Sequence, residues 1–418
     1  MLKINETYKT YIVGAGIAGL SSACYATKNN QNVEIFEGST YAGGRCRSYY
    51  DKNLNIEIDN GNHLVLSANE NFLDMCELIN STNTIESFGS NFNFYDLKKN
   101  KNWSLEISNK YFPFWILDKK NRIPDTSLKD YLSLLKIFYV NRNHSVADLF
   151  LNSGNLYKSF WEPLTLGILN TECENASAFL LTNVIKKSFL KGRDYCQIIQ
   201  PKKNWNETLI KPIIDYLEKN SVSIKYKNIL KSIEIENNVI TRLNFNNNEI
   251  LINKEDKVIL CLPPNSLNRI MPQINLPKEF NTILNIHFKL DKNIISGLKV
   301  PILGMLNSIT HWVFLKKNYI SVTISSANKF NDLGSEKIAK LVWSEISRGL
   351  GISKIKIPDY KVLREKKATY QQSPQNYKLI QKIRSLPLNL KLAGDWTEKY
   401  LPSTIESSIL SGKNSVIK

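Results

Sequence analysis

The stretch that decides the fold is Lys9–Gly19, KTYIVGAGIAG. A short apolar run, Tyr11–Val13, leads directly into a turn with three glycines, and the residues after it are small and compatible with a helix. The first glycine allows a tight turn, the second lets the backbone approach a pyrophosphate, and the third lets the helix pack close to the strand. The stretch therefore predicts a strand, turn and helix that hold a dinucleotide at the helix N-terminus. The turn comprises Gly14, Ala15, Gly16, Ile17, Ala18 and Gly19.

A second strand supports this interpretation. The run Val33–Phe36 is β-like, and the acidic Glu37 that follows it lies 18 positions after Gly19. This is close to the spacing of the carboxylate that binds ribose hydroxyls in dinucleotide-binding folds. The alternative, an ordinary glycine turn in a βαβ unit, does not account for the acidic residue. The sequence thus predicts an α/β fold with a Rossmann-like, parallel sheet.

Length, charge and cysteine content limit the class of protein. The chain has 418 residues, a formal net charge of +17 and six cysteines without CxxC spacing. We expect free thiols, no metal site and no nucleic-acid partner, because no metal-ligand cluster or recognition module is present. The basic excess is interpreted either as a membrane-facing patch or as dispersed lysines. No signal peptide or spanning apolar run is found, so we expect a cytoplasmic protein whose membrane contact is peripheral.

A second glycine loop narrows the choice of cofactor. Gly43, Gly44 and Arg45 follow Glu37 closely, and they suit a loop that bends around a dinucleotide, with the arginine near a phosphate. The combination of GxGxxG, the acidic residue and GGR resembles the FAD-binding amine oxidase and phytoene desaturase superfamily. The resemblance implies that FAD is the cofactor.

The motif DNGNH at 59–63 gives a narrower resemblance. With WEPL at 161–164, LNT at 169–171 and LREKKAT at 363–369, it resembles the bacterial squalene-associated desaturases, now assigned as hydroxysqualene dehydroxylases. In the resembled superfamily a glycine motif at this point lies under the flavin ring, which implies cofactor contacts for Gly61, Asn62 and His63. His63 is also our candidate for a catalytic acid, and its alternative is a turn histidine that bonds to backbone or flavin oxygen.

The C-terminal signature GDWT, followed by LPSTIESSILSG, completes the predicted cofactor site. Asp395, after Gly394, can accept hydrogen bonds from ribityl hydroxyls or lie at the pyrophosphate. A helix that begins at Thr404 and Ile405 can direct N–H groups and its positive dipole end at the flavin. In the resembled superfamily a strand near Leu230 lies by the adenine.

The resemblance spans residues 10 to 414 and implies a domain organisation. We expect a discontinuous FAD-binding domain (1–90, 200–265 and 386–418) and a substrate domain of sheet and helices (91–199 and 266–385). The aromatic residues Trp115, Trp161 and Trp312 are candidates to line a tunnel for an apolar isoprenoid. Apolar positions at 128–139 suit one face of an amphipathic helix, either packed on the core or resting on a bilayer.

The activity implied by the resemblance is the reductive removal of the hydroxyl group of hydroxysqualene, which gives squalene for hopanoid synthesis. This net reduction needs an electron donor, NADPH or another reductant, and the sequence has no second glycine motif for NADPH. Two alternatives use the same fold: a carotenoid-type desaturase or amine oxidase that runs oxidatively, and a prenyl-lipid binder like the GDP-dissociation inhibitors. The intact GGR and GD motifs favour a flavoenzyme over the binder.

Overall fold

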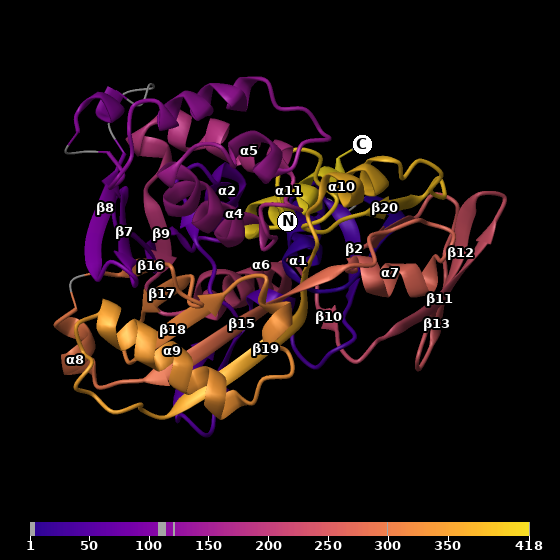
Figure 1. The fold of residues 1–418 in the computed structure, drawn as a ribbon. Coiled ribbons are helices and arrows are strands. Elements are labelled where there is room, and N and C mark those ends of the chain that lie inside the picture. Colours follow the sequence, from indigo (N-terminus) through magenta and orange to yellow (C-terminus); the bar gives the residue numbers. More distant parts are fainter. Residues whose placement is uncertain (1–4, 108–113, 120–121, 299, 418) are drawn as a thin grey trace.

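The fold contains two large sheets (Figure 1), and the computed structural model describes residues 5–107, 114–119, 122–298 and 300–417. The first sheet has five strands, and each neighbouring pair is parallel. In spatial order they are β10 (Ile224–Lys225), β2 (Gln31–Phe36), β1 (Asn5–Val13), β14 (Lys257–Leu260) and β20 (Leu390–Leu392). The parallel sheet confirms the predicted Rossmann-like core.

The centre of this sheet is buried because its strands are apolar on both faces. Ile12 of β1 and Ile259 of β14 are completely buried and pair in register. The helix α1 (Ile17–Lys28) follows β1 and packs against α11 (Ile405–Val416). The two helices approach closely at Gly412, where an added Cβ would lie 2.5 Å from the carbonyl oxygen of Ala18. The first and last helices of the chain thereby form one layer on the sheet.

The second large sheet has seven strands and is antiparallel, except that β7 pairs with β16 in parallel. It is drawn from two parts of the chain, as the indigo-purple and orange arrows show in Figure 1. In spatial order the strands are β19 (Tyr360–Tyr370), β15 (Phe280–Lys289), β18 (Tyr319–Ile324), β17 (Trp312–Leu315), β16 (Ile302–Leu306), β7 (Asn91–Asp96) and β8 (Lys101–Glu106).

Shorter elements connect the two sheets. The remaining strands form small sheets: β3 (Ser48–Asp51) with β4 (Ile56–Asp59); β5 (Val65–Leu66), β9 (Ile198–Pro201) and β6 (Ile85–Ser87); and β11 (Leu230–Glu236), β12 (Val239–Phe245) and β13 (Glu249–Leu251). The other α-helices are α2 (Glu70–Leu78), α3 (Val146–Phe150), α4 (Glu162–Leu169), α5 (Ala178–Lys187), α6 (Lys211–Lys219), α7 (Pro264–Ile270), α8 (Lys292–Ser296), α9 (Ser335–Gly349) and α10 (Pro374–Gln381).

The segment 128–139 differs from the expected amphipathic α-helix, because Asp130–Phe138 is a 3₁₀ helix. With three residues per turn, positions three apart lie in one row. Tyr131 and Ile137 therefore face the core, whereas Leu132 and Leu135 lie on a different, exposed row. The broad single face expected from α-helical spacing is wrong for this reason. Within the described residues, no helix is long and apolar enough to span a bilayer.

Candidate functional site

The glycine turn after β1 is shaped by close backbone contacts. Gly14 has φ of +104°, and its N–H donates to the carbonyl of Phe36 at 2.7 Å. An added Cβ at Gly14 would lie 2.7 Å from the carbonyl oxygen of Cys261, and one at Gly19 would lie 1.8 Å from the carbonyl oxygen of Gly14. At Gly16 an added Cβ meets no atom within 4 Å. Two glycines thus serve the packing of strand and helix, and the third borders open space.

Glu37 and the second glycine loop adjoin this open space. The Glu37 carboxylate accepts hydrogen bonds from the N–H of Ala15 at 2.7 Å and from that of Ser39 at 2.8 Å. The Gly43 N–H donates to the carbonyl of Ala15 at 2.8 Å, and Gly43 forms a bridge with Gly16. Gly43 and Gly44 have φ of +96° and +54°, which favours glycine at both positions. The two loops that the sequence predicted to share a dinucleotide therefore lie side by side.

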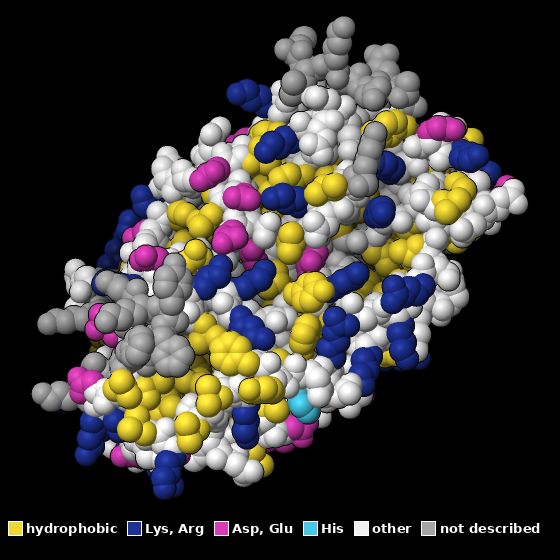
Figure 2. Space-filling model, turned by 90° about the horizontal axis from the view of Figure 1, so that it is seen from above, with side chains coloured by type: hydrophobic (Ala, Val, Ile, Leu, Met, Phe, Trp, Pro, Cys, Tyr) yellow, Lys and Arg dark blue, Asp and Glu magenta, His cyan; other side chains and the backbone are white. Residues whose placement is uncertain are grey.

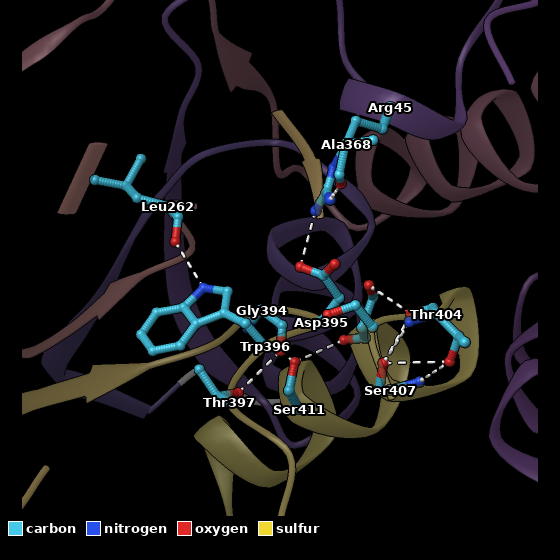
Figure 3. A network of polar contacts seen from close by, with 12 residues as sticks. Arg45, Leu262, Ala368, Gly394, Asp395, Trp396, Thr397, Thr404, Ser407 and Ser411 are labelled. Atoms are coloured by element: carbon cyan, nitrogen blue, oxygen red, sulfur yellow. Dashed lines mark hydrogen bonds and ion pairs between the residues drawn. The ribbon is translucent and has the colours of Figure 1, made fainter. Parts of the chain in front are cut away.

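Arg45 connects this loop to the C-terminal motif (Figure 3). Its guanidinium is 2.8 Å from the Asp395 carboxylate and also donates to the carbonyl of Ala368. The Asp395 charge raises the pKa of Arg45 further, so the arginine is always charged. The N–H of Gly394 donates to Ser411 of α11 at 3.0 Å, which fixes the motif to the helix. The arginine expected near a phosphate is thus paired with the aspartate expected at the same cofactor.

The start of α11 is closed by a reciprocal cap. The Thr404 side chain accepts from the N–H of Ser407, and the Ser407 hydroxyl accepts from the N–H of Thr404 at 2.9 Å. The cap uses the Thr404 amide, and Ile405 is the first residue of the helix. Donation from this helix start to a flavin stays a prediction. Leu230, the residue expected near an adenine, begins β11 and is buried. The preceding residue, Ile229, packs close to Gly38: a Cβ added at Gly38 would lie 3.3 Å from the Ile229 side chain.

The loop at 59–63 meets a polar face of the seven-stranded sheet. The Asn62 side chain donates to the hydroxyls of Ser321 at 2.7 Å and Thr323 at 2.9 Å. These two residues of β18 pair in register with His287 and Asn285 of β15. Ser321 hydrogen-bonds the His287 Nδ1 at 2.7 Å, and Thr323 donates to the Asn285 amide oxygen at 2.8 Å. The loop and two strands therefore form one polar cluster inside an apolar domain.

Two buried atoms of the loop point into this region without a partner. Among the described residues, neither Asn62 Oδ1 nor His63 Nε2 has a hydrogen-bond partner, although each atom is inaccessible to solvent. The Nε2 of His63 would lie 3.8 Å from a Cβ added at Gly61, which sets the ring beside the loop's glycine. A buried polar atom without a protein partner is costly, and its explanation can be a catalytic role or a bound group such as a water or an ion. Both atoms belong to residues that the sequence predicted to contact the cofactor.

Burial also sets the protonation of the histidines. It lowers the pKa of His63 to about 4, against a smaller opposing effect of the Asp59 charge. Burial lowers the pKa values of His287 and His311 to about 4 as well. All three rings are therefore neutral near pH 7, consistent with the bond that the His311 Nδ1 accepts from the N–H of Ser325 at 3.0 Å. His63 and His287 belong to the polar cluster, and we call His63, His287 and His311 the three low-pKa histidines; His287 is fully buried and the other two are partly buried.

Sequence reasoning missed several residues around His63. The Gln200 amide donates to the His63 carbonyl at 2.9 Å, and Lys316 lies 3.5 Å from the fully buried Asp59 carboxylate. Trp205 packs edge-on against the His63 ring, with centroids 5.8 Å apart. A signal for the strand partners was present, because polar residues alternate within the otherwise apolar runs of β15 and β18. Their pairing with the 59–63 loop could not be inferred from spacing alone.

Two of the predicted tunnel residues, Trp161 and Trp312, belong to the same hydrophobic cluster. Trp161 is completely buried and stacks on Phe150 with ring centroids 3.7 Å apart. Trp312 packs over Gly167, where an added Cβ would lie 2.8 Å from the indole nitrogen. The side chain of Trp115 lies outside the described residues. Their role in binding a substrate stays a prediction.

Comparison with known proteins gives the family. The model of the flavin-containing amine oxidoreductases matches residues 17–416. A hydroxysqualene dehydroxylase of Zymomonas mobilis is 34% identical, covering 97% of both chains, and one of Sinorhizobium fredii is 31% identical, covering 97% of this chain and 96% of that one. The chain belongs to the hydroxysqualene dehydroxylase family, within the flavin-containing amine oxidoreductases.

Comparison with solved structures shows the same fold in an amine oxidase. Cyclohexylamine oxidase from Brevibacterium oxydans superposes with a TM-score of 0.73 at 11% identity, covering 98% of each chain, and this likeness concerns the fold alone. The family implies a flavin cofactor and oxidoreductase chemistry. The residues fit a flavin, because open space borders Gly16. In the 59–63 loop, the buried atoms Asn62 Oδ1 and His63 Nε2 have no hydrogen-bond partner among the described residues. This dehydroxylase-family chain is therefore a flavin-dependent oxidoreductase.

Proposed function

We propose that the protein binds FAD and removes the hydroxyl group of hydroxysqualene reductively, giving squalene for hopanoid synthesis. The observation that carries the proposal is the identity of 31% and 34% to two hydroxysqualene dehydroxylases over nearly the whole of each chain. The proposal agrees with the site, since Gly14 and Gly19 lie where close backbone packing requires glycine and Gly16 borders open space. Both the substrate and the choice of FAD are part of this proposal.

The chain would hold FAD with residues from several segments that lie far apart in the sequence. Gly16 and the N–H groups at the start of α1 bind the pyrophosphate, because the helix terminus offers unpaired donors and a positive dipole end. Glu37 binds the ribose of the adenosine half, since its carboxylate adjoins the Ala15 amide. Asp395, held by Arg45 at 2.8 Å, lies by the ribityl chain or the pyrophosphate. Gly61, Asn62, His63 and Ile405 would contact the isoalloxazine ring.

The reaction breaks one C–O bond and forms one C–H bond. When bound and reduced, FAD supplies the hydride and thus both electrons. The departing hydroxyl group takes a proton and leaves as water, which leaves a delocalised allylic cation. The hydride then adds to this cation and forms the C–H bond. The residues around the site serve this chemistry by excluding water and by presenting aromatic faces to positive charge. A reductant of the cell, NADPH or another donor, must then restore the electrons.

His63 is our proposed donor of the proton. Only about one ring in 1,000 is protonated at pH 7 when the pKa is about 4. Desolvation makes the protonated form a strong acid, which suits transfer to a poor leaving group, while its scarcity slows the reaction near neutrality. Lys316 and Asp59 lie 3.5 Å apart, and their charges have opposite effects on the His63 pKa, which Asp59 raises and Lys316 lowers. The proposal thus predicts a rate that rises as the pH falls.

The test is product analysis with purified flavin-loaded protein. Hydroxysqualene is supplied in detergent under anaerobic conditions, with dithionite as reductant, and squalene is measured by gas chromatography with mass detection. We expect squalene in an amount that depends on reduced enzyme. A yellow, fully reducible protein that leaves hydroxysqualene intact would refute the substrate, and oxidation of phytoene or of an amine by the same sample would assign an oxidative activity instead.

A further inference from the structure

An exposed apolar row runs along the 3₁₀ helix Asp130–Phe138. Leu132, Leu135 and Phe138 lie three residues apart, so the three-residue turn aligns them on one side of the helix. Their exposed fractions are 63%, 52% and 62%, and Tyr139, which follows, is 81% exposed. We call these four residues the apolar row. An apolar set of this kind is costly in water unless a partner covers it.

The helix beneath the apolar row is firmly held, so the row is a fixed feature of the surface. Tyr131 and Ile137 are buried in the core cluster on the opposite side. The Tyr131 hydroxyl accepts from the N–H of Ile123 at 2.9 Å, and Lys136 donates to the carbonyl of Leu149 at 2.7 Å. Leu132 and its neighbours therefore cannot turn inward without breaking these contacts. The helix therefore has one row of residues that packs on the core and a second row that remains exposed.

Positive charge surrounds the apolar row. Lys129 begins the same row one turn earlier, and Lys136 and Arg142 are exposed nearby. The acidic side chains of this segment are engaged locally: Asp125 with Lys99 at 2.6 Å, Asp130 with the N–H of Ser127 at 2.7 Å, and Asp148 with the N–H of Ser145 at 2.8 Å. Figure 2 looks down on the upper face of Figure 1 and shows hydrophobic patches interspersed with Lys and Arg side chains. The net charge of the chain, +17, adds a long-range attraction for anionic surfaces.

We propose that the apolar row and its basic neighbours dock the protein onto the surface of an anionic lipid bilayer. Leucine and phenylalanine side chains enter the boundary between headgroups and acyl chains, while the lysines and the arginine meet lipid phosphates. The 3₁₀ helix lies in the plane of the membrane, and none of the described helices is long and apolar enough to cross it. This inference goes beyond the proposed function and does not depend on the identity of the substrate.

A second copy of the chain fits this surface less well. A symmetric contact would bring the basic neighbours of one apolar row against those of the other, which is unfavourable. Four side chains also fall short of the roughly 20–30 residues that each partner contributes to a stable interface. An anionic bilayer satisfies both the apolar and the charged parts of the surface.

The experiment is flotation of the flavin-loaded protein with lipid vesicles. Vesicles of phosphatidylcholine alone are compared with vesicles that also contain phosphatidylglycerol, at low and at high salt. We expect flotation with phosphatidylglycerol that weakens at high salt. The triple variant L132E/L135E/F138E should bind at least about tenfold more weakly. The matched control L251E/L388E changes leucines that are 66% and 76% exposed elsewhere, and it should float like the parent protein.

A second measurement reads the apolar row directly. A fluorophore that responds to polarity is attached to F138C, and its emission should shift to the blue with phosphatidylglycerol vesicles only. The proposal is overturned if the triple variant floats as well as the parent, if emission does not shift, or if gel filtration shows a dimer that the triple variant abolishes. Activity toward hydroxysqualene in detergent should be unchanged in the triple variant, so a failure of the proposed function is distinguishable from a failure of docking.

Discussion

Gly16→Ala should leave the folded chain intact and weaken cofactor binding. Gly16 is the N-cap of α1 with φ of −74°, a value that alanine adopts readily, and its added Cβ meets no protein atom within 4 Å. Replacing glycine by alanine at an N-cap costs about 0.5–1 kcal/mol. The lower entropy of the unfolded alanine chain returns about 0.4–1 kcal/mol. The two effects nearly cancel, and in a chain of 418 residues 1 kcal/mol changes the melting temperature by only about 1 °C.

The cofactor, in contrast, should meet the new methyl group. If the pyrophosphate lies over Gly16, the methyl displaces it, and we expect FAD to bind at least about tenfold more weakly, or about 1.4 kcal/mol. The assay removes the flavin, records thermal unfolding of the flavin-free protein, and then titrates FAD by its fluorescence. Gly334→Ala is the matched control, because Gly334 is also a helix N-cap with no atom within 4 Å of an added Cβ. It should change neither quantity.

Gly19→Ala, unlike Gly16→Ala, should destabilise the flavin-free chain itself. Its Cβ would lie 1.8 Å from the carbonyl oxygen of Gly14, so strand and helix must separate. Overpacking of this kind costs about 1–3 kcal/mol or more, and the flavin-free protein should melt at a lower temperature. The reasoning is refuted if Gly16→Ala binds FAD like the parent protein, or if it destabilises the flavin-free chain as much as Gly19→Ala does.

Four further predictions follow from the same structure. Dehydroxylation should accelerate about tenfold per unit from pH 7 toward pH 5, because the His63 pKa is about 4, and His63→Gln should abolish that slope; a flat profile in the parent enzyme would exclude His63 as the acid. Asp395→Asn removes the charge that faces Arg45 at 2.8 Å, so FAD should bind more weakly with little loss of melting temperature; unchanged FAD affinity would remove Asp395 from the site. The three low-pKa histidines have folded pKa values of about 4, below their unfolded values, so the unfolded chain binds more protons and urea stability should fall as the pH drops from about 6.5 to 4; stability constant over this range would contradict these lowered pKa values. Burial raises the pKa of Cys76 to about 11 and of Cys196 to about 12, so native thiols should react with Ellman's reagent at least about 100-fold more slowly than unfolded ones; rapid native reaction would show that they are accessible.

The local motifs could be interpreted from the sequence because each depends on residues close together in the chain. The glycine turn, the GGR loop and the start of the last helix at Thr404 and Ile405 are set by backbone geometry over a few positions, and all of them occur where the sequence predicted. The parallel sheet follows from the same βαβ logic. Glycine positions report backbone requirements directly, which is why they are informative without a structure.

The combination of distant segments was decided only by the tertiary structure. Arg45 and Asp395 are 350 positions apart, and Asn62 meets Thr323 across 261 positions, so no spacing rule relates them. The apolar residues that remain exposed on Asp130–Phe138 depend on its 3₁₀ form, in which Tyr131 and Ile137 pack on the core and the row that contains Leu132 and Leu135 stays outside. Local backbone chemistry determined where a dinucleotide could bind. Long-range packing determined which side chains surround His63 and which apolar residues remain outside.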